Sequence, residues 1–204
     1  MSQVQKEVIA NSATEIDASG LAKSYRPGEH ESAISARWRE SGCFKARPDS
    51  KAEPFTMFIP PPNVTAALHL GHALNNTLQD TLARHARMRG RDVLWMPGTD
   101  HAGIATQTVV ERRLALQGKK RTDFTRDEFV AQVQAWKDEY ERVILEQLVA
   151  MGCSCDFDRT RFTMDPVCAA GVREGFFRLF KDGLIERGRR LVNWDPKNKN
   201  GHRG

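Results

Sequence analysis

Two histidines stand three residues apart in a segment that favours a bound anion. The segment reads PPPNVTAALHLGH over residues 60–72, so His69 and His72 share one face at the start of a predicted helix. The free N–H groups of a first helical turn, together with the helix dipole, attract an anion to this place. Gly71 carries no side chain, and a flat ligand could therefore lie against the backbone. A phosphate attached to an aromatic base fits this combination.

The histidine pair has two other interpretations. An isolated H-x-x-H pattern is more often a pair of surface histidines satisfied by water. Histidine is also the commonest metal ligand, although a metal site would need a third ligand from Asp100 or His101. Such a site would leave the prolines and Asn63 without a role, so we predict no metal ligands here.

A candidate cation site lies in a second segment, which reads WMPGTDHAGIATQ over residues 95–107. The single carboxylate of this segment, Asp100, could hold an amine opposite the anion site. The alternative is that Asp100 caps the N-terminus of the following helix, since aspartate is a preferred capping residue. The segment alone leaves both roles open.

Both segments follow predicted strands. Short apolar runs at Phe55–Ile59 and Asp92–Met96, each ended by proline, suit buried strands. Helices are predicted at Leu68–Arg89, where leucines recur every four residues, and at Ile104–Gln117. Strand, helix, strand, helix is the pattern of an open parallel sheet. Ligands bind at the carboxyl ends of such strands, so the two segments should converge on one edge of the sheet.

Further elements flank this unit. Residues 1–27 are polar and are predicted to form a loose leader, followed by a short helix at Glu29–Glu40 that a glycine closes. Two more helices are predicted at Thr125–Met151 and Pro166–Lys181. Arg190–Asn193 has the pattern of the start of another strand.

The 204 residues have the composition of a folded domain. Apolar residues make up 40% and charged residues 28%, with a mean hydropathy of −0.55, which excludes a disordered or fibrous chain. No apolar run reaches the roughly 18 residues that cross a membrane. The first residues lack the apolar core of a signal peptide. A cytoplasmic protein without a membrane partner is therefore predicted.

The placement of charge and of cysteines bears on nucleic-acid binding and on zinc binding. The net charge is +5, and the stretch from Lys181 to Gly204 holds seven basic and three acidic residues, so nearly all of the excess lies in the last 24 residues. Charge alone therefore gives no argument for a nucleic-acid partner. Four cysteines without a secretory signal indicate reduced thiols. Cys153 and Cys155 have C-x-C spacing but no second pair for zinc, so buried or incidental thiols are the better interpretation.

These segments together resemble the valyl-tRNA synthetases, a family of class I aminoacyl-tRNA synthetases. The H-x-G-H element at residues 69–72 matches the family's HIGH signature, which other nucleotidyltransferases share. PPNVT at residues 61–65 and GTDHAGIATQ at residues 98–107 are specific to the valyl enzymes. Phe162–Asp165 and Arg190–Pro196 also fit, and the resemblance runs from about Ser32 to Lys197.

The resemblance implies an ATP site at the histidine segment. His69 and His72 resemble the catalytic pair that binds ATP phosphates and stabilises charge on the α-phosphoryl group, and Gly71 resembles the glycine under the adenine. The implied reaction is attack of the valine carboxylate on the α-phosphorus of ATP, giving valyl-adenylate, followed by transfer to tRNA(Val). The carboxylate is already ionised, so positioning and charge stabilisation supply the rate without a general base. Mg²⁺ is expected with ATP.

The resemblance also implies an amino-acid pocket. Asp100 resembles the carboxylate that receives the valine ammonium. Pro60, Pro61 and Asn63 resemble the wall and the polar contact of this pocket. A pocket of this kind cannot strongly reject threonine, because threonine is an isostere that merely adds a hydroxyl.

The fold that the resemblance implies is α/β: the first half of a class I synthetase Rossmann-like parallel sheet with flanking helices, preceded by a short helical leader. Residues 1–47 are expected to form the leader with its short helix, and residues 48–190 the first half of the nucleotide-binding catalytic domain. Residues 191–204 are expected to be the truncated start of the connection to the editing insertion. The implied partners are valine, ATP and tRNA(Val), and an oligomer is not expected of the family.

The family's chains are several times longer than this one. The second half of the nucleotide-binding fold, the KMSKS loop, the editing insertion and the anticodon-binding helices have no counterpart in the sequence, and residues 198–204 look like an artificial or frameshifted end. We therefore expect the chain alone, with half of the site, to show no aminoacylation. Two alternatives stay open: a non-catalytic remnant or module that binds ATP or tRNA, and a small nucleotidyltransferase of the H-x-G-H type.

Overall fold

The described part of the first of two units in the chain forms one helix. The computed structural model describes residues 25–195 and 200–202, and the chain divides between Cys43 and Phe44. Helix α2 (Pro27–Ser41) begins with a proline, whose missing N–H costs nothing in the first turn. It ends at Gly42, which has a φ of +60° and donates its N–H to the carbonyl of Arg39. The predicted helix is confirmed, whereas residues 1–24 of the predicted leader lie outside the described residues.

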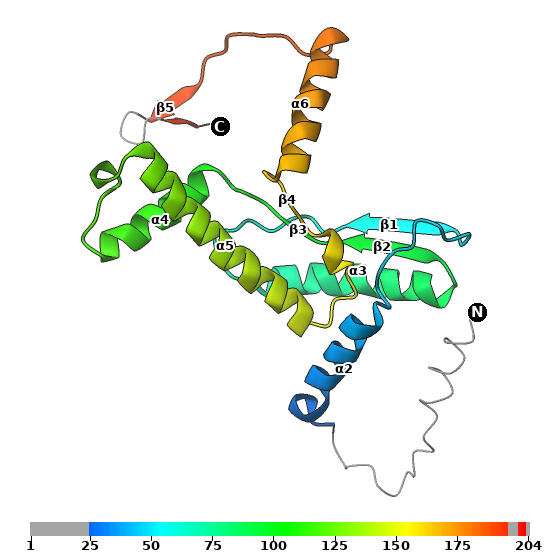
Figure 1. The fold of residues 1–204 in the computed structure, drawn as a ribbon. Coiled ribbons are helices and arrows are strands. Elements are labelled where there is room, and N and C mark those ends of the chain that lie inside the picture. The colour runs from blue at the N-terminus through cyan, green and yellow to red at the C-terminus, as the bar shows by residue number, and fades with distance from the viewer. Residues whose placement is uncertain (1–24, 196–199, 203–204) are drawn as a thin grey trace, which may run out of the picture. The chain divides into compact units, whose positions relative to one another are not determined.

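The second unit opens with a strand, a helix and a second strand (Figure 1). Strands β1 (Pro54–Phe58) and β2 (Asp92–Met96) pair in parallel, with Phe55 opposite Val93. Helix α3 (Leu70–Met88) connects them. Parallel neighbours need such a crossover, since a tight turn would reverse the chain direction. The predicted parallel βαβ unit is therefore confirmed.

The chain from Asp92 to Asp100 is the middle of three extended segments. On one edge, the carbonyl of Met96 accepts a hydrogen bond from Ile59, and that of Asp100 accepts one from Val64, both at 3.0 Å. On the other edge, three carbonyls accept hydrogen bonds from the segment after helix α5 (Arg126–Ala150). These bonds join Trp95 to Asp156 (2.9 Å), Pro97 to Arg161 (3.3 Å) and Thr99 to Thr163 (3.1 Å).

The pairing along the second edge involves two short strands that the sequence pattern did not predict. Strand β3 (Gly98–Thr99) pairs in parallel with strand β4 (Arg161–Phe162). Two residues are too few to show an alternating pattern. A Cβ atom at Gly98 would lie 2.8 Å from the carbonyl oxygen of Arg161, so this close pairing requires glycine.

Three longer helices follow β3 or β4. Helices α4 (Ile104–Leu116), α5 (Arg126–Ala150) and α6 (Pro166–Lys181) lie where helices were predicted. Short 3-10 turns lie at Arg121–Asp123 and Phe157–Arg159. Helix α4 packs against α5 through a small apolar cluster of Val110, Leu114 and Phe129.

The end of the described chain forms a hairpin of β5 (Asn193–Asp195) with β6 (Asn200–His202) in antiparallel pairing. The start of a strand predicted at Arg190–Asn193 is confirmed only at its last residue, because pairing begins at Asn193. The apolar residues of this stretch, Leu191 and Val192, are exposed.

Within the described part of the chain, no helix is long and apolar enough to cross a membrane.

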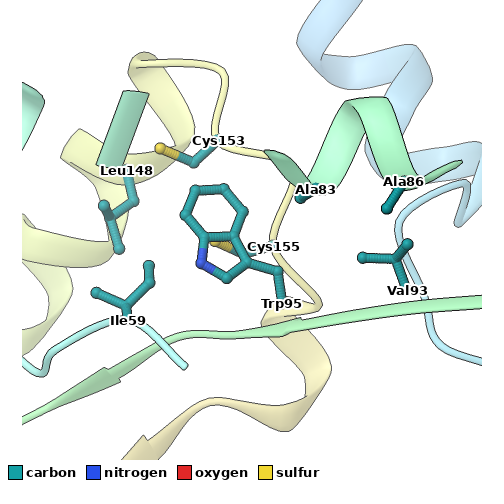
Figure 2. Close-up of a cluster of buried hydrophobic side chains, with 8 residues drawn as sticks. All are labelled: Ile59, Ala83, Ala86, Val93, Trp95, Leu148, Cys153 and Cys155. Carbon is teal, nitrogen blue, oxygen red and sulfur yellow. The ribbon is translucent and has the colours of Figure 1, made fainter. Parts of the chain in front are cut away.

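Trp95 forms the centre of the main core (Figure 2). It is fully buried, and its indole N–H donates to the side-chain oxygen of Gln79 at 3.0 Å, so the buried donor is satisfied. Ala83 and Ala86 have small side chains, which let α3 pack closely against the strands. Leu148 of α5 also belongs to this buried cluster.

Cys153 and Cys155 are buried in the same cluster. Burial raises the pKa of the Cys153 thiol to about 12, and it raises the pKa of Cys155 as well. The interpretation of this pair as buried thiols is confirmed.

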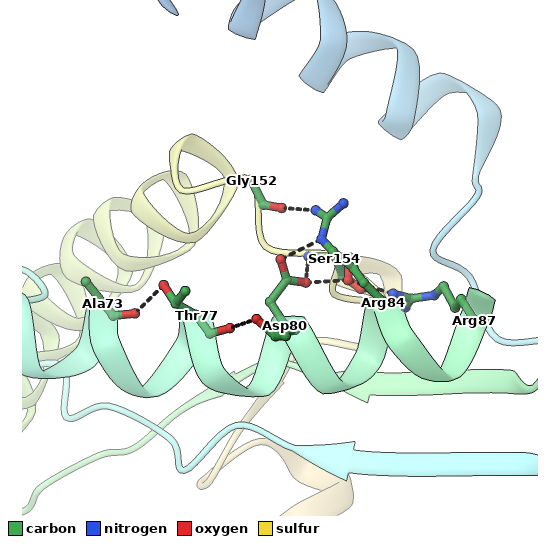
Figure 3. Close-up of polar contacts among 8 residues, drawn as sticks. Ala73, Thr77, Asp80, Arg84, Arg87, Gly152 and Ser154 are labelled. Atoms are coloured by element: carbon green, nitrogen blue, oxygen red, sulfur yellow. Dashed lines mark hydrogen bonds and ion pairs between the residues drawn. The ribbon is translucent and has the colours of Figure 1, made fainter. Parts of the chain in front are cut away.

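A polar network anchors α3 to the loop that leads into the second edge (Figure 3). Asp80 accepts the N–H of Ser154 at 3.0 Å and also its hydroxyl, and it forms an ion pair with Arg84 at 2.7 Å. Arg84 donates to the carbonyl of Gly152 and Arg87 to that of Ser154, at 2.7 and 2.8 Å. The loop is thereby fixed before it pairs with Trp95.

The leucines that predicted α3 do not form its buried face. Leu70, Leu74, Leu78 and Leu82 are 54–88% exposed. The helix instead buries Asn76, Ala83 and Ala86. The four-residue period therefore identified the helix correctly but marks a face that no described residue covers.

Candidate functional site

Asn63 and Asp100 meet directly at the carboxyl end of the sheet. They form a parallel bridge, in which the N–H of Asp100 donates to the carbonyl of Pro62 at 2.8 Å and the N–H of Val64 donates to that of Asp100 at 3.0 Å. The three prolines between β1 and this bridge have no N–H to donate, so pairing pauses there and resumes at Asn63. The structure thus joins the two predicted segments at one edge.

The predicted pocket residues differ in burial. Pro60, Pro61 and Asn63 are exposed, whereas Pro62 and Val64 are buried. The two buried residues anchor the segment, and the three exposed residues are free to present a surface next to Asp100. The residues predicted to contact an amino acid are therefore the ones that the fold leaves accessible.

The carboxylate of Asp100 is held by a threonine from the far edge of the sheet. The hydroxyl of Thr163 donates to Asp100 Oδ1 at 2.8 Å. Within the described residues, no hydrogen bond involves Oδ2, and the side chain is 33% exposed. Asp100 can therefore accept a cationic donor from solvent while its other oxygen stays fixed.

Asp100 does not cap helix α4, so this alternative is wrong. The N-cap of α4 is Gly103, and no side chain accepts a hydrogen bond there. The turn before the helix passes through Ala102 and Gly103 with φ of +50° and +43°. The hydroxyl of Thr106 closes it by donating to the carbonyl of His101 at 2.6 Å. A left-handed alanine is strained, and this turn carries the strain beside the candidate site.

His69 is the N-cap of α3, and His72 completes a reciprocal capping box. His69 Nδ1 accepts the N–H of Gly71 at 3.0 Å, and His72 Nδ1 accepts the N–H of His69 at 3.2 Å. One first-turn donor that the sequence left free for an anion, the N–H of Gly71, is therefore occupied by the ring of His69.

The capping box fixes the direction in which each ring can donate. Because both Nδ1 atoms accept, the proton of each neutral ring resides on Nε2. The ring centroids of His69 and His72 lie 4.0 Å apart. The pair can therefore offer two neighbouring N–H donors to an anion in place of the backbone amides.

Gly71 has a second reason to be glycine. A Cβ atom there would lie 2.9 Å from Cε1 of His69, closer than side chains normally approach. The missing side chain thus gives space to the capping ring of His69, in addition to the access for a flat ligand that the sequence predicted.

Burial lowers the pKa of His72, and the adjacent His69 lowers it further. Both causes favour the neutral ring, which is the form that can accept the N–H of His69. The electrostatics and the capping geometry therefore agree on one protonation state.

Helix α5 positions all three site segments by long-range hydrogen bonds. The indole of Trp136 donates to the carbonyl of Val64 at 3.0 Å, after the prolines. Glu141 accepts the hydroxyl of buried Thr99 at 3.1 Å, before Asp100. Gln147 accepts the N–H of Leu68 at 2.8 Å, before the histidine pair. One rigid helix therefore sets the places of the segments relative to one another.

Glu141 is fixed in turn by an ion pair with Lys137 at 2.8 Å. Burial lowers the pKa of Lys137, but its contacts with Glu141 and Asp138 outweigh burial, and the pKa is raised overall. The lysine also lies over the ring of Phe162, 4.7 Å from its centre. These residues were not among the candidates, because their spacing shows no local pattern.

The chain matches the family model described as tRNA synthetases class I (I, L, M and V) over residues 33–201. The match begins near Ser32, as the resemblance indicated, and extends past its expected limit at Lys197. Two curated relatives named Valine--tRNA ligase come from Parabacteroides distasonis and Rhodopirellula baltica. They are 54% identical over 87% of the chain and 56% identical over 84% of it.

The chain spans about a fifth of the length of these relatives, namely 20% and 17%. A solved leucyl enzyme, the LeuRS of Agrobacterium radiobacter K84 in a ternary complex with tRNA and LeuAMS, has a TM-score of 0.70 to the chain. It is 22% identical, over 87% of this chain and 21% of that one, and it shows the fold alone. The predicted α/β synthetase fold and the family resemblance are confirmed. By the family match over most of its residues, the chain belongs to the class I tRNA synthetases (I, L, M and V).

Proposed function

We propose that this chain carries the amino-acid and ATP-phosphate contacts of a valine–tRNA ligase. The observation that carries the proposal is the bridge between Asn63 and Asp100, which joins the two segments that resemble the valyl enzymes. The names of the relatives, each about half identical to the chain, support valine as the amino acid.

The amino-acid contacts come from the exposed prolines and Asp100. The free Oδ2 of Asp100 accepts the α-ammonium of valine, and a charge-assisted hydrogen bond of this kind is short and strong. Pro60 and Pro61 supply an apolar wall for the side chain, and Asn63 supplies a polar contact. These roles place the valine carboxylate away from Asp100, where it can reach the nucleotide.

The ATP contacts come from the histidine pair. The Nε2–H groups of His69 and His72 donate to phosphate oxygens and stabilise the charge that grows on the α-phosphoryl group. A carboxylate oxygen of valine bonds to the α-phosphorus, and the bond to the bridging oxygen of pyrophosphate breaks. Valyl-adenylate results, and the valyl group then passes to tRNA(Val). No proton has to be removed from the carboxylate, so orientation is the main demand.

Mg²⁺ is expected to come with ATP, bound to its phosphates. Among the described residues, no group of three or more histidine, cysteine, aspartate or glutamate side chains could hold a metal ion.

The test is a chimera of the Parabacteroides distasonis relative in which this chain replaces the matched N-terminal part. The chimera should catalyse ATP–pyrophosphate exchange that depends on valine, and Asp100→Asn should abolish most of it. The exposed Asp127→Asn on helix α5 is the matched control and should keep the exchange. A folded chimera that shows no exchange, or that depends on another amino acid, would contradict the proposal.

A further inference from the structure

The structure assigns Thr163 as a positioning residue that orients the Asp100 carboxylate for an α-ammonium group. The assignment rests on the proposed function of Asp100. Thr163 touches no substrate in this account and acts only through Asp100. Its position follows from the second, unpredicted edge of the sheet, where β4 ends and Thr163 comes next.

The backbones of the two residues are fixed before their side chains meet. Asp100 follows β3 and Thr163 follows β4, and the last paired residues are Thr99 and Phe162. The N–H of Thr163 donates to the carbonyl of Thr99 at 3.1 Å, which extends the pairing by one step. Asp100 is fixed from its other edge by Pro62 and Val64. Neighbouring parallel strands therefore hold the two side chains in register.

The hydroxyl of Thr163 is saturated with hydrogen bonds. It donates its single hydrogen to Asp100 Oδ1 at 2.8 Å, since the carboxylate can only accept. Its oxygen accepts the backbone N–H of His101 at 3.1 Å. The ring Nδ1 of His101 lies 2.8 Å from the same oxygen, whose hydrogen is already used, so Nδ1 carries the proton and donates.

This arrangement has a consequence for recognition. Oδ1 of Asp100 accepts the hydroxyl of Thr163 and lies 3.4 Å from the ring Nδ1 of His101, whereas no hydrogen bond among the described residues involves Oδ2. Oδ2 is therefore the oxygen that can accept a cationic donor. Threonine is stiff at χ1, so the donor is held in one rotamer. A carboxylate that is already held in one orientation loses less conformational entropy when it binds an ammonium group than a mobile carboxylate does. We therefore expect the fixed carboxylate to discriminate better between an ammonium and a hydroxyl group.

The first readout is the tautomer of His101 in the 204-residue chain, from ¹⁵N shifts of its ring at about pH 8, where histidine is normally neutral. The wild-type chain and Thr163→Ser should show a protonated Nδ1 and an unprotonated Nε2. Thr163→Val, which keeps the shape and loses the hydroxyl, should weaken this preference, because Asp100 Oδ1, at 3.4 Å, is then the remaining acceptor for Nδ1. A protonated Nε2 in the wild-type chain would overturn the assignment.

The second readout is the affinity for L-valine compared with 2-hydroxy-3-methylbutanoate, which has a hydroxyl in place of the ammonium. The wild-type chain should prefer valine, and Thr163→Val should weaken valine binding about tenfold with little effect on the hydroxy acid. Thr163→Ser should restore the preference, and Thr81→Val on the exposed side of α3 should leave it unchanged.

The outcomes separate the two proposals. If the wild-type chain prefers valine and Thr163→Val keeps that preference, the positioning role is wrong and the proposed function stands. If the wild-type chain does not distinguish valine from the hydroxy acid, the proposed role of Asp100 fails and the ammonium-orienting role of Thr163 fails with it. A loss of the hydroxy acid's affinity equal to that of valine would also overturn the assignment, because it would indicate a general loss of structure.

Discussion

Asn63 and Asp100 pair across adjacent extended segments, although the chain between them contains the whole of helix α3. The bridge places the residue after the three prolines beside the residue after β3. Both residues lie at the carboxyl ends of parallel strands, where α/β sheets bind their ligands. This single pairing turns two separate motifs into one candidate site.

Gly98 limits how closely β3 and β4 can pair, and Gly98→Ala tests this limit. The new Cβ would lie 2.8 Å from the backbone oxygen of Arg161, which cannot rotate away. We expect a loss of about 1–3 kcal/mol in the free energy of unfolding, measured by urea denaturation. Gly175→Ala in α6, where no atom lies within 4 Å, is the control and should be neutral or stabilise by up to about 1 kcal/mol. Equal effects of the two substitutions would contradict the close pairing.

The capping box at α3 should make stability depend on pH. The pKa of His72 is lowered in the folded chain, so the unfolded chain binds more protons as the pH falls. The contribution of neutral His72 is therefore complete above its ordinary pKa of about 6.5 and is lost as the pH falls through the lower folded value. The thermal midpoint of the wild-type chain should fall more between about pH 7 and pH 5 than that of His72→Asn. Parallel curves for the two proteins would show that His72 does not contribute in this way.

Thiol reactivity should follow burial. Cys43 is exposed and should react first with Ellman's reagent, a phase that Cys43→Ser removes. Cys153 and Cys155 are buried, and burial raises the pKa of each, to about 12 for Cys153, so almost no thiolate forms near neutral pH. They should react only after unfolding in urea. Rapid labelling of either cysteine in the native chain would contradict the packing of the main core.

Gln147 should couple α5 to the histidine pair. Gln147→Met removes the acceptor of the Leu68 N–H, and we expect a loss of about 1 kcal/mol together with shifts in the ring signals of His69 and His72. Gln134→Met, on the same helix, changes an exposed side chain whose contact is to Asp138, and it is the matched control. Histidine signals that respond equally to both variants would contradict the positioning role of α5.

The sequence predicted the elements that carry a strong local pattern. β1, α3 and β2 have apolar runs or a long helical period, and the predicted parallel unit formed from them. The leucine period did not identify which face of α3 is buried. The side chains that pack against the strands are alanines, and the leucines lie on another face. Small side chains let the helix approach closely, and hydropathy alone does not reveal this choice.

The sequence named the candidate site residues but not the residues that hold them in place. His69, His72, Asn63 and Asp100 were candidates because they stand in local motifs, and the structure pairs Asn63 with Asp100. Thr163 lies far from Asp100 in the chain, and strands of two residues have no period, so no spacing indicated their contact. The capping role of His69 was missed for a different reason, since histidine is not among the usual N-cap residues.

The division into residues 1–47, 48–190 and 191–204 stays a prediction. The structure divides the chain once, between Cys43 and Phe44, close to the first of the expected limits. The site described above lies wholly in the second unit. Its properties therefore do not depend on where the leader is placed.

The most direct test of the central claim is a ¹H–¹⁵N NMR titration of the 204-residue chain with a non-hydrolysable valyl-adenylate analogue. The account predicts that the amide signals of Asn63 and Asp100 shift together with those of His69 and Gly71, because one ligand contacts both segments. Valine alone should shift only the first pair, and ATP alone only the second. Shifts confined to one segment by the full analogue, or shifts elsewhere in the chain, would contradict a single site built from both.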